Sequence, residues 1–204
     1  MELVILAIVA GLSFASYAIW KQARGVDEPG GPAALDGNAP SLAALTDGER
    51  TIHTMLTGDV VSHLGQDFLV EGVLTLNDDG RITRLYRLVD GGCERWLGAR
   101  PGDDSPLLLD ESPDFTVESN GPEAITRGGR PFRLAHRESP QCAASGAVGA
   151  EREGGRAQLY EYVGAGAARI LALVWPGRVD TFAGERVACH LVEILPGAAT
   201  GSSA

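Results

Sequence analysis

The sequence predicts a mainly β fold, in which two related antiparallel β-meanders form one sandwich-like or barrel-like domain behind an N-terminal transmembrane helix. Three observations indicate this architecture. An uninterrupted apolar run lies close to the N-terminus. From Gly58 onward, short β-branched and aromatic segments alternate with turn residues at regular spacing. One hairpin pattern of this kind occurs twice in the chain.

The apolar run covers residues 3–20, which contain no charge and no proline, and it predicts a membrane anchor over residues 1–24. A helix of this length spans ~27 Å, close to the hydrocarbon thickness of a bilayer of about 30 Å. A cleaved signal peptide is the alternative, but signal peptides carry positive charge before the apolar run, and only Met1 and Glu2 stand there. The basic residues Lys21 and Arg24 follow the run, so the positive-inside rule predicts a single-pass protein whose remaining chain is cytoplasmic.

The rest of the chain divides by composition. Residues 25–45 are rich in Gly, Pro and Ala and predict a flexible linker. An all-β domain is expected over residues 46–196 and a disordered tail over 197–204, which are small and polar. A short helix is expected around 47–56, where apolar residues fall at helical spacing.

The strands of the first meander are bounded by turn residues. A strand is expected over residues 68–76 and ends at Asn77-Asp78-Asp79-Gly80, a strong hairpin signal. A second strand over 82–89 leads through Asp90-Gly91-Gly92 into a third over 94–99.

The second half of the domain repeats this pattern. Residues 84–97 align without gaps on residues 158–171, sharing Leu-Tyr, a Val four residues after the Leu, a Gly turn and Arg-apolar-Leu. Residues 65–68 match residues 129–132 at a shorter offset, which predicts an exposed loop over 138–155. An internal duplication accounts for the match, and a chance likeness of two hairpins is the alternative, because β-propensity restricts which residues recur.

The duplication divides the domain into about 58–112 and 122–196. Since strand residues alternate between faces, Leu85 and Leu159 are expected to share one environment, and Tyr86 and Tyr160 the opposite one.

Seven short runs of hydrophobic and turn residues carry a family resemblance: residues 57–61, 65–72, 85–88, 95–97, 160–162, 173–175 and 184–187. These runs resemble the bacterial domain-of-unknown-function family numbered 4178, over about residues 50–196. The resemblance implies an all-β domain of unassigned function in a membrane-anchored member of that family, and it implies no catalytic residue.

Charge and lysine content exclude several classes of activity. Lys21, Arg24 and Glu2 lie in the first 25 residues, so the remainder has 15 basic and 26 acidic residues, a formal net charge of −11. Such a domain is repelled by phosphate backbones, which excludes nucleic acid as a partner. Lys21 is the only lysine, so the domain has no Walker A or Schiff-base lysine.

Metal ligands and nucleophiles are not predicted. The histidines and cysteines show no HxH, HExxH or CxxC spacing; they are His53, His63, His136, His190, Cys93, Cys142 and Cys189. The odd, unpaired cysteines agree with a reducing compartment.

Other candidate motifs are explained by turns. Gly164-Ala165-Gly166-Ala167-Ala168-Arg169 begins like a dinucleotide loop, but it lies between two strands and predicts a hairpin turn. Asp78-Asp79 and Asp103-Asp104 stand beside Gly or Pro, or within a turn, where Asp is favoured. The sequence therefore predicts no catalytic, cofactor-binding or metal-binding residue, and no cofactor.

Six aromatic residues have two interpretations. They either anchor the core, which the low aromatic content favours, or line a ligand groove; they are Tyr86, Trp96, Tyr160, Tyr162, Trp175 and Phe182. A binding surface, where present, is expected between the two meanders.

These observations favour a membrane-tethered, non-enzymatic interaction or scaffold module, part of a complex at the bacterial inner membrane. Its partners are the membrane, through residues 3–20, and a neighbouring protein. The alternative is a small-ligand sensor, or an enzyme with an unrecognised site between the two meanders. A secreted or periplasmic structural protein is a third reading, which reversed topology or a disulfide would support.

Overall fold

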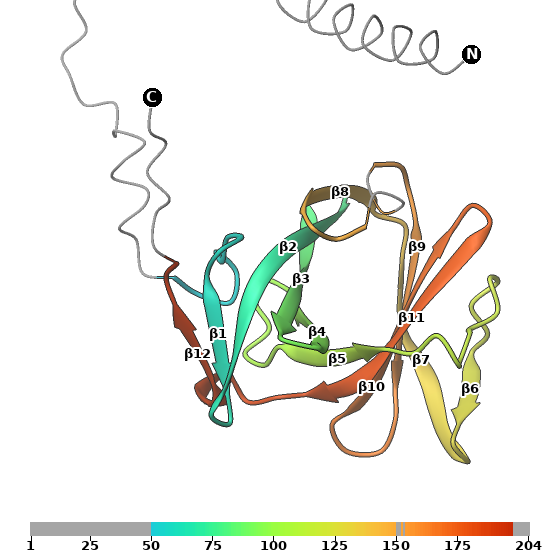
Figure 1. Cartoon of the computed structure of the whole chain (residues 1–204). Helices are drawn as coiled ribbons and strands as arrows, with labels where there is room; N and C mark the ends of the chain where they lie inside the picture. Colours follow the sequence, from blue (N-terminus) through green and yellow to red (C-terminus); the bar gives the residue numbers. More distant parts are fainter. Residues whose placement is uncertain (1–49, 150–151, 153, 198–204) are drawn as a thin grey trace, which may run out of the picture. The chain divides into compact units, whose positions relative to one another are not determined.

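The computed structural model describes residues 50–149, 152 and 154–197 (Figure 1). The predicted anchor, the linker and the residues beyond 197 lie outside this range. No helix in the described part of the chain is long and apolar enough to cross a membrane.

The described residues form one antiparallel sheet. Its strands are β1 (Val60–His63), β2 (Gln66–Asp78), β3 (Arg81–Asp90), β4 (Cys93–Ala99), β5 (Leu107–Glu111), β6 (Ala124–Arg127), β7 (Arg130–Glu138), β8 (Gln141–Gly146), β9 (Gln158–Val163), β10 (Ala168–Trp175), β11 (Arg178–Arg186) and β12 (Val192–Leu195), with a 3-10 helix η3 (Cys189–Leu191) before β12. The order is β12-β1-β2-β3-β4-β5-β11-β10-β9-β7-β6, with β8 paired to β2.

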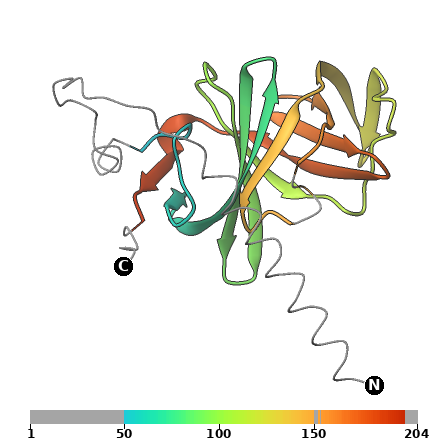
Figure 2. The ribbon, with the colours of Figure 1, turned by 90° about the horizontal axis from the view of Figure 1, so that it is seen from above.

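The predicted mainly β, antiparallel class is confirmed, but the sheet does not close into a barrel. Strands β1–β5 run as one meander, β6, β7 and β9–β11 form the second, and the pairing of β5 with β11 joins them. Seen from above, β1 and β12 lie at one end of the sheet and β6 and β7 at the other (Figure 2).

The sheet branches because β2 bends at a bulge between Val70 and Gly72. Its first part pairs with β1 and its second with β8.

The predicted turn between β2 and β3 is confirmed. Asp78 pairs with Arg81, which leaves Asp79 and Gly80 as a two-residue loop. Both loop residues have positive φ, 49° and 92°, as the tightest hairpin turns require. The main-chain N–H of Gly80 donates to Oδ1 of Asn77 at 2.8 Å, so the Asn side chain also stabilises the turn.

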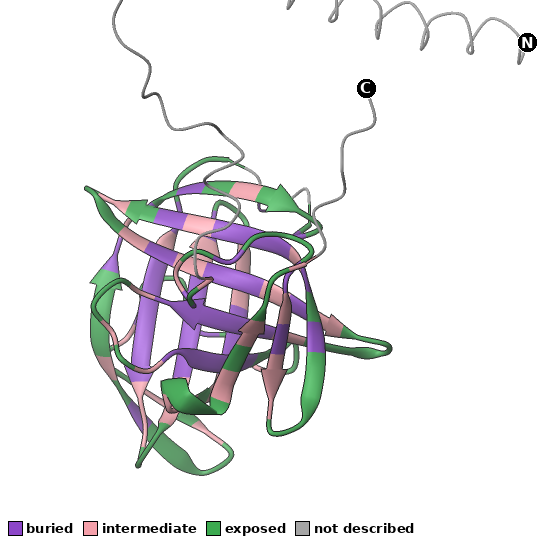
Figure 3. Cartoon of the chain, turned by 90° about the vertical axis from the view of Figure 1, so that its left-hand side faces the viewer, coloured by how far each residue is buried: buried purple, intermediate pink, exposed green. Residues whose placement is uncertain are grey.

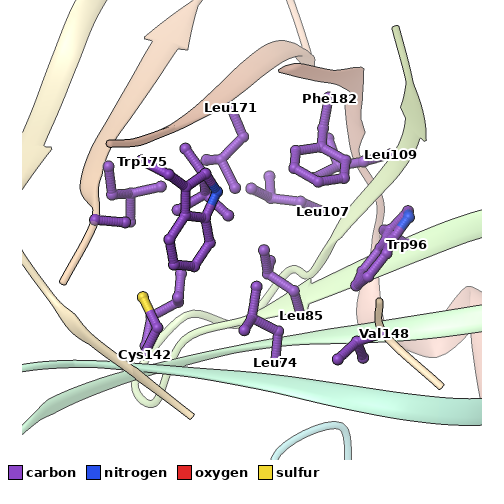
Figure 4. Packing of buried hydrophobic residues seen from close by; sticks show 14 residues of the cluster. Leu74, Leu85, Trp96, Leu107, Leu109, Cys142, Val148, Leu171, Trp175 and Phe182 are labelled. Carbon is purple, nitrogen blue, oxygen red and sulfur yellow. The ribbon is translucent and has the colours of Figure 1, made fainter. Parts of the chain in front are cut away.

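Both meanders contribute to a central core, where side chains from facing strands converge (Figure 4). This central cluster consists of Leu74, Leu76, Leu85, Trp96, Leu107, Leu109, Cys142, Val148, Ala157, Leu159, Leu171, Leu173, Trp175 and Phe182. Each fully buried leucine contributes about 1.5–3 kcal/mol relative to an exposed one.

Two flanking clusters cover the opposite faces of the strands. The first flanking cluster, on β1–β5, consists of Ile52, Met55, Val61, Phe68, Val70, Val73, Tyr86, Leu88, Leu97, Ala99, Leu108 and Val187. The second flanking cluster, on β7 and β9–β11, consists of Val117, Phe132, Tyr160, Tyr162, Ile170, Ala172 and Ala183. Figure 3 shows the resulting bands of buried residues along the strands, with exposed residues at the loops. The prediction that the six aromatic residues anchor the core is confirmed, because all six are buried.

The predicted alternation of faces is confirmed up to the Gly turn, and Leu85 and Leu159 share the central cluster as expected. Tyr86 and Tyr160 lie outside the central cluster but in the first and second flanking clusters respectively, so the prediction that the tyrosines share one environment is wrong. Beyond the turn the gapless alignment is wrong by one residue, since Trp96 is central but its aligned Ile170 is not.

Loop length explains this slip. In the β3–β4 hairpin, Val89 pairs with Glu94, so four residues separate the two partners. In the β9–β10 hairpin, the aligned Val163 pairs with Arg169, so five residues separate them. A one-residue change in register moves every following side chain to the other face.

Two local expectations are wrong. Residues 50–56 form turns in place of the described part of the expected helix, because the Thr51 N–H bonds to the Thr54 hydroxyl at 2.9 Å, which competes with helical bonding. The expected exposed loop over 138–155 contains β8, which pairs with β2. Small residues allow this approach: a Cβ on Gly72 would lie 2.6 Å from Cγ1 of Val148.

The two ends of the described domain meet at the buried carboxylate of Asp59. Its Oδ1 accepts a 2.9 Å hydrogen bond from the Gly197 N–H, and its Oδ2 accepts one of 2.7 Å from the Leu56 N–H. Arg50 Nε lies 3.5 Å from Oδ2. The chain therefore enters and leaves the domain at the same place, beside β1 and β12.

Candidate functional site

An open groove of about 590 Å³ lies along the outer face of β10 and β11, where β5 joins the two meanders. Its floor is made of small residues, Ala168 on β10 and Ala183 and Gly184 on β11. Gly184 is required there, because a Cβ would lie 2.0 Å from the Leu108 carbonyl oxygen of the paired β5 strand. We call this feature the seam groove.

Three arginines line the seam groove from three different strands. Arg127 ends β6, Arg130 begins β7 and Arg169 lies on β10. Arg127 donates a 2.9 Å hydrogen bond to the Ser112 hydroxyl, and its guanidinium lies 5.9 Å from the Phe115 ring centroid. Arg130 is exposed, and its side chain makes no hydrogen bond or ion pair within the described residues.

Two carboxylates and an aromatic ring complete the lining. Asp110 on β5 is held by Arg95, whose Nε and Nη2 donate to its two oxygens at 2.8 and 3.3 Å. Asp114 is exposed, and no partner for it is found in the described part of the chain. Phe132 on β7 presents a buried ring. With Asp110 paired from outside the groove, the lining carries an excess of positive charge.

Glu161 is buried behind the seam groove, on the face of β9 that points to the central cluster. Its side chain is only 3 % exposed and lies among three guanidinium groups. Oε1 is 3.7 Å from Nε of Arg169 and 3.6 Å from Nη2 of Arg186, and Oε2 accepts a 3.4 Å hydrogen bond from Arg100. Glu161 therefore fixes the position of Arg169, whose Nε is buried and makes no hydrogen bond with the described residues.

A second buried ion pair network closes the other end of the central cluster. Arg152 stacks over the rings of Trp96 and Phe182, with 5.1 and 5.8 Å from guanidinium carbon to ring centroid. It donates to Asp180 at 3.0 Å and also to Glu111. The small hollow beside it measures about 120 Å³. These contacts satisfy the arginine, so the network stabilises the fold.

The histidines and cysteines are spread over the domain. His53 lies in the first turn, His63 ends β1, His136 is exposed on β7, and His190 is exposed in η3. Cys189 and His190 are adjacent in the 3-10 turn. No three His, Cys, Asp or Glu residues of the described chain are grouped to hold a metal ion.

The remaining candidate motifs lie in turns. Residues 164–167 connect β9 to β10, Asp78 and Asp79 border the β2–β3 turn, and Asp103 accepts a 3.2 Å hydrogen bond from Arg186. Of these motifs, only the end of Gly164–Arg169 reaches the seam groove, through Ala168 and Arg169 at the start of β10.

The groups with shifted pKa values lie outside the groove, most of them in the core. Burial raises the pKa of Tyr86 to about 12 and also raises the pKa of Tyr162 and of the Cys142 thiol. The hydrogen bond from Arg87 lowers the pKa of Glu94. None of these groups lines the seam groove.

Sequence reasoning missed the arginines of the groove and Glu161. One signal was present: Glu161 alternates with Leu159, so it places a charge on a face that is otherwise apolar. The three arginines carry no such signal, because residues 127, 130 and 169 meet only through strand pairing.

Comparison with known proteins gives one family and no individual relative. A search of the curated proteins found no match, and a search of the solved structures found none. The family model described as Domain of unknown function (DUF4178) matches residues 56–188, from the turn before β1 to the end of the strand region before η3. Because this match covers more than half of the sequence, the chain belongs to the DUF4178 family.

Proposed function

We propose that this chain is a membrane-tethered, non-enzymatic interaction module that holds a protein partner in the seam groove. The apolar run of residues 3–20 supports the tether, and residues 25–45 supply a linker. The single observation that carries the binding proposal is the seam groove itself, which is open, of ligand-site size and lined by side chains from both meanders.

The surroundings of the reactive side chains support a role without catalysis. Cys142 is buried and its thiol lies 3.7 Å from the Pro140 carbonyl oxygen, while burial raises its pKa, which disfavours the nucleophilic thiolate. The groove combines guanidinium groups, carboxylates, a phenyl ring and small residues. Such a lining recognises a partner by charge and shape, and it offers no general base beside a nucleophile.

The alternative remains a small-ligand sensor or an enzyme whose site lies between the meanders. The contact of Arg169 with buried Glu161 favours this alternative, since it links the groove to a polar network inside the core. A sensor of this kind would bind a small molecule of defined structure with no requirement for a protein.

Site-specific photo-crosslinking in living cells tests the proposal. A photo-reactive amino acid replaces Asp114, which lines the groove, or Asp104, an exposed loop aspartate outside it, in the full chain. Crosslinks to one protein species from position 114 and not from 104 support an interaction module. Equal crosslinking from both positions, or none from 114, would refute binding in the groove.

A further inference from the structure

We propose that the seam groove binds an extended, acidic segment of a partner protein, whose carboxylates are captured by Arg127, Arg130 and Arg169. The inference rests on the proposed function and names the chemistry of the partner.

The first argument is the number of unused donors. A guanidinium has five N–H donors. Arg127 uses one of them on Ser112, and Arg130 uses none within the described residues. Arg169 donates through Nη1 to the carbonyl oxygens of Gly166 and Ala168, and its buried Nε faces Glu161, so the unused donors of Arg169 within the described residues are those of Nη2. Carboxylates are the groups in proteins that satisfy such donors best, because they accept two parallel hydrogen bonds.

The second argument is local charge. Residues 50–197 contain 15 arginines and no lysine against 21 acidic residues, so the domain as a whole is acidic. The lining of the seam groove differs from this balance: Asp110 is paired with Arg95, Arg169 faces the buried Glu161, and Arg127 and Arg130 are opposed only by Asp114 among the lining carboxylates. An acidic ligand is repelled by the domain at long range and depends on short-range contacts with these arginines.

The third argument is the adjacent strand edge, which favours an extended segment over a small anion. Strand β6 is the last strand of the sheet and pairs only with β7 among the described strands. Its outer edge offers unpaired main-chain groups to which an extended chain can add. Arg127 is the last residue of this edge strand, so a segment paired with β6 reaches the groove directly.

Glu161 acts as a positioning residue in this arrangement. It does not line the seam groove, but it lies 3.7 Å from Nε of Arg169 and is itself buried with Arg100 and Arg186. It thereby fixes the Arg169 guanidinium at the floor, so that little side-chain entropy is lost when a ligand binds.

Fluorescence anisotropy on the detergent-solubilised full chain tests the proposal, with a labelled peptide of alternating Glu and Thr as the probe. The matched control peptide has Gln in place of Glu. We expect the Glu peptide to bind at least tenfold more tightly than the Gln peptide.

Variants of β7 provide matched controls, since Arg130 and Arg133 are both exposed and lie on opposite faces of the strand. Arg130→Gln is expected to weaken binding of the Glu peptide about tenfold, and Arg133→Gln less than twofold.

Glu161→Gln is expected to weaken binding of the Glu peptide in the parent chain and to have no further effect on it in an Arg169→Gln background. A purely structural loss would weaken both backgrounds equally.

Several results would overturn the inference. Equal binding of the Glu and Gln peptides, or equal losses from Arg130→Gln and Arg133→Gln, would exclude recognition by these arginines. Binding of inorganic phosphate without binding of the Glu peptide would make the groove a small-anion site. Crosslinks from position 114 combined with any of these results would support the proposal that the chain is an interaction module and refute the proposal that its partner segment is acidic. Binding of the Glu peptide without such crosslinks would refute the proposal that the chain is an interaction module.

Discussion

Leu85 on β3 and Leu159 on β9 are 74 positions apart in the sequence and lie in the same buried central cluster. Each precedes a tyrosine that points to the opposite face, Tyr86 into the first flanking cluster and Tyr160 into the second. The two meanders therefore share one core through equivalent leucines and cover it with equivalent tyrosines on either side.

This shared core makes both leucines costly to truncate. Leu85→Ala and Leu159→Ala are each expected to lower the free energy of unfolding by about 2–5 kcal/mol, because each leaves a cavity among facing strands. Chemical denaturation of the full chain in mild detergent measures the change. Leu69→Ala is the control, since Leu69 is 44 % exposed. An effect no larger than that of the control would show that the central cluster is not closely packed.

Asp59 is expected to be a second determinant of stability. Replacing it with Ala removes the acceptors of the Leu56 and Gly197 N–H groups and the partner of Arg50. We expect a loss of about 3 kcal/mol, since buried donors are left without a charged acceptor. Hydrogen exchange should show faster exchange of the Leu56 and Gly197 amides than in Asp67→Ala, which changes an exposed aspartate. Unchanged protection would disprove the link between the two ends of the domain.

Glu161 is expected to stabilise the polar network behind the groove. Glu161→Gln leaves Arg100, Arg169 and Arg186 without their shared buried carboxylate, which we expect to cost about 3 kcal/mol. Glu185→Gln, at an exposed position on β11, is expected to change stability by less than about 0.5 kcal/mol. Equal effects of the two substitutions in denaturation experiments would contradict this assignment.

Stability is expected to fall at alkaline pH because of Tyr86. Burial raises its folded pKa to about 12 from the ordinary value of 10.0, so the folded state resists ionisation that the unfolded chain undergoes. The resulting stabilisation is complete below pH ~10 and is lost as the pH rises toward ~12. Denaturation at a series of pH values should show a smaller decline in Tyr86→Phe. A decline of the same slope in this variant would exclude Tyr86; Tyr162, whose pKa is also raised by burial, would account for a remaining slope.

The domain of residues 50–197 is expected to be cytoplasmic, because Lys21 and Arg24 follow the apolar run and no basic residue precedes it. Cys93 and Cys189 are exposed and report on topology directly. A membrane-impermeant maleimide should label them only after the cells are permeabilised, and a reporter fused after Ala204 should be active only inside the cell. Labelling in intact cells would reverse the predicted orientation.

Local sequence patterns were sufficient for the strands and turns. The Asn77–Gly80 turn and the alternation of Leu85 with Tyr86 depend on neighbouring residues, so both could be predicted and both are confirmed. Patterns of the same kind failed at residues 47–56, where side-chain hydrogen bonds of Thr51 and Thr54 replace helical bonding in the described part.

The mainly β class, the family and the shared burial of Leu85 and Leu159 could be predicted from residue order alone, because strand propensity, turn residues and alternation act over a few residues. The pairing of β8 with β2, the pairing of β5 with β11 and the open sheet depend on how the whole chain folds. The seam groove belongs to this second group. Arg127 and Arg169 come together through the ladders of β6, β7, β9 and β10, and Glu161 meets Arg100 across the core. Such contacts depend on which strands pair, and no local preference of these residues specifies that choice.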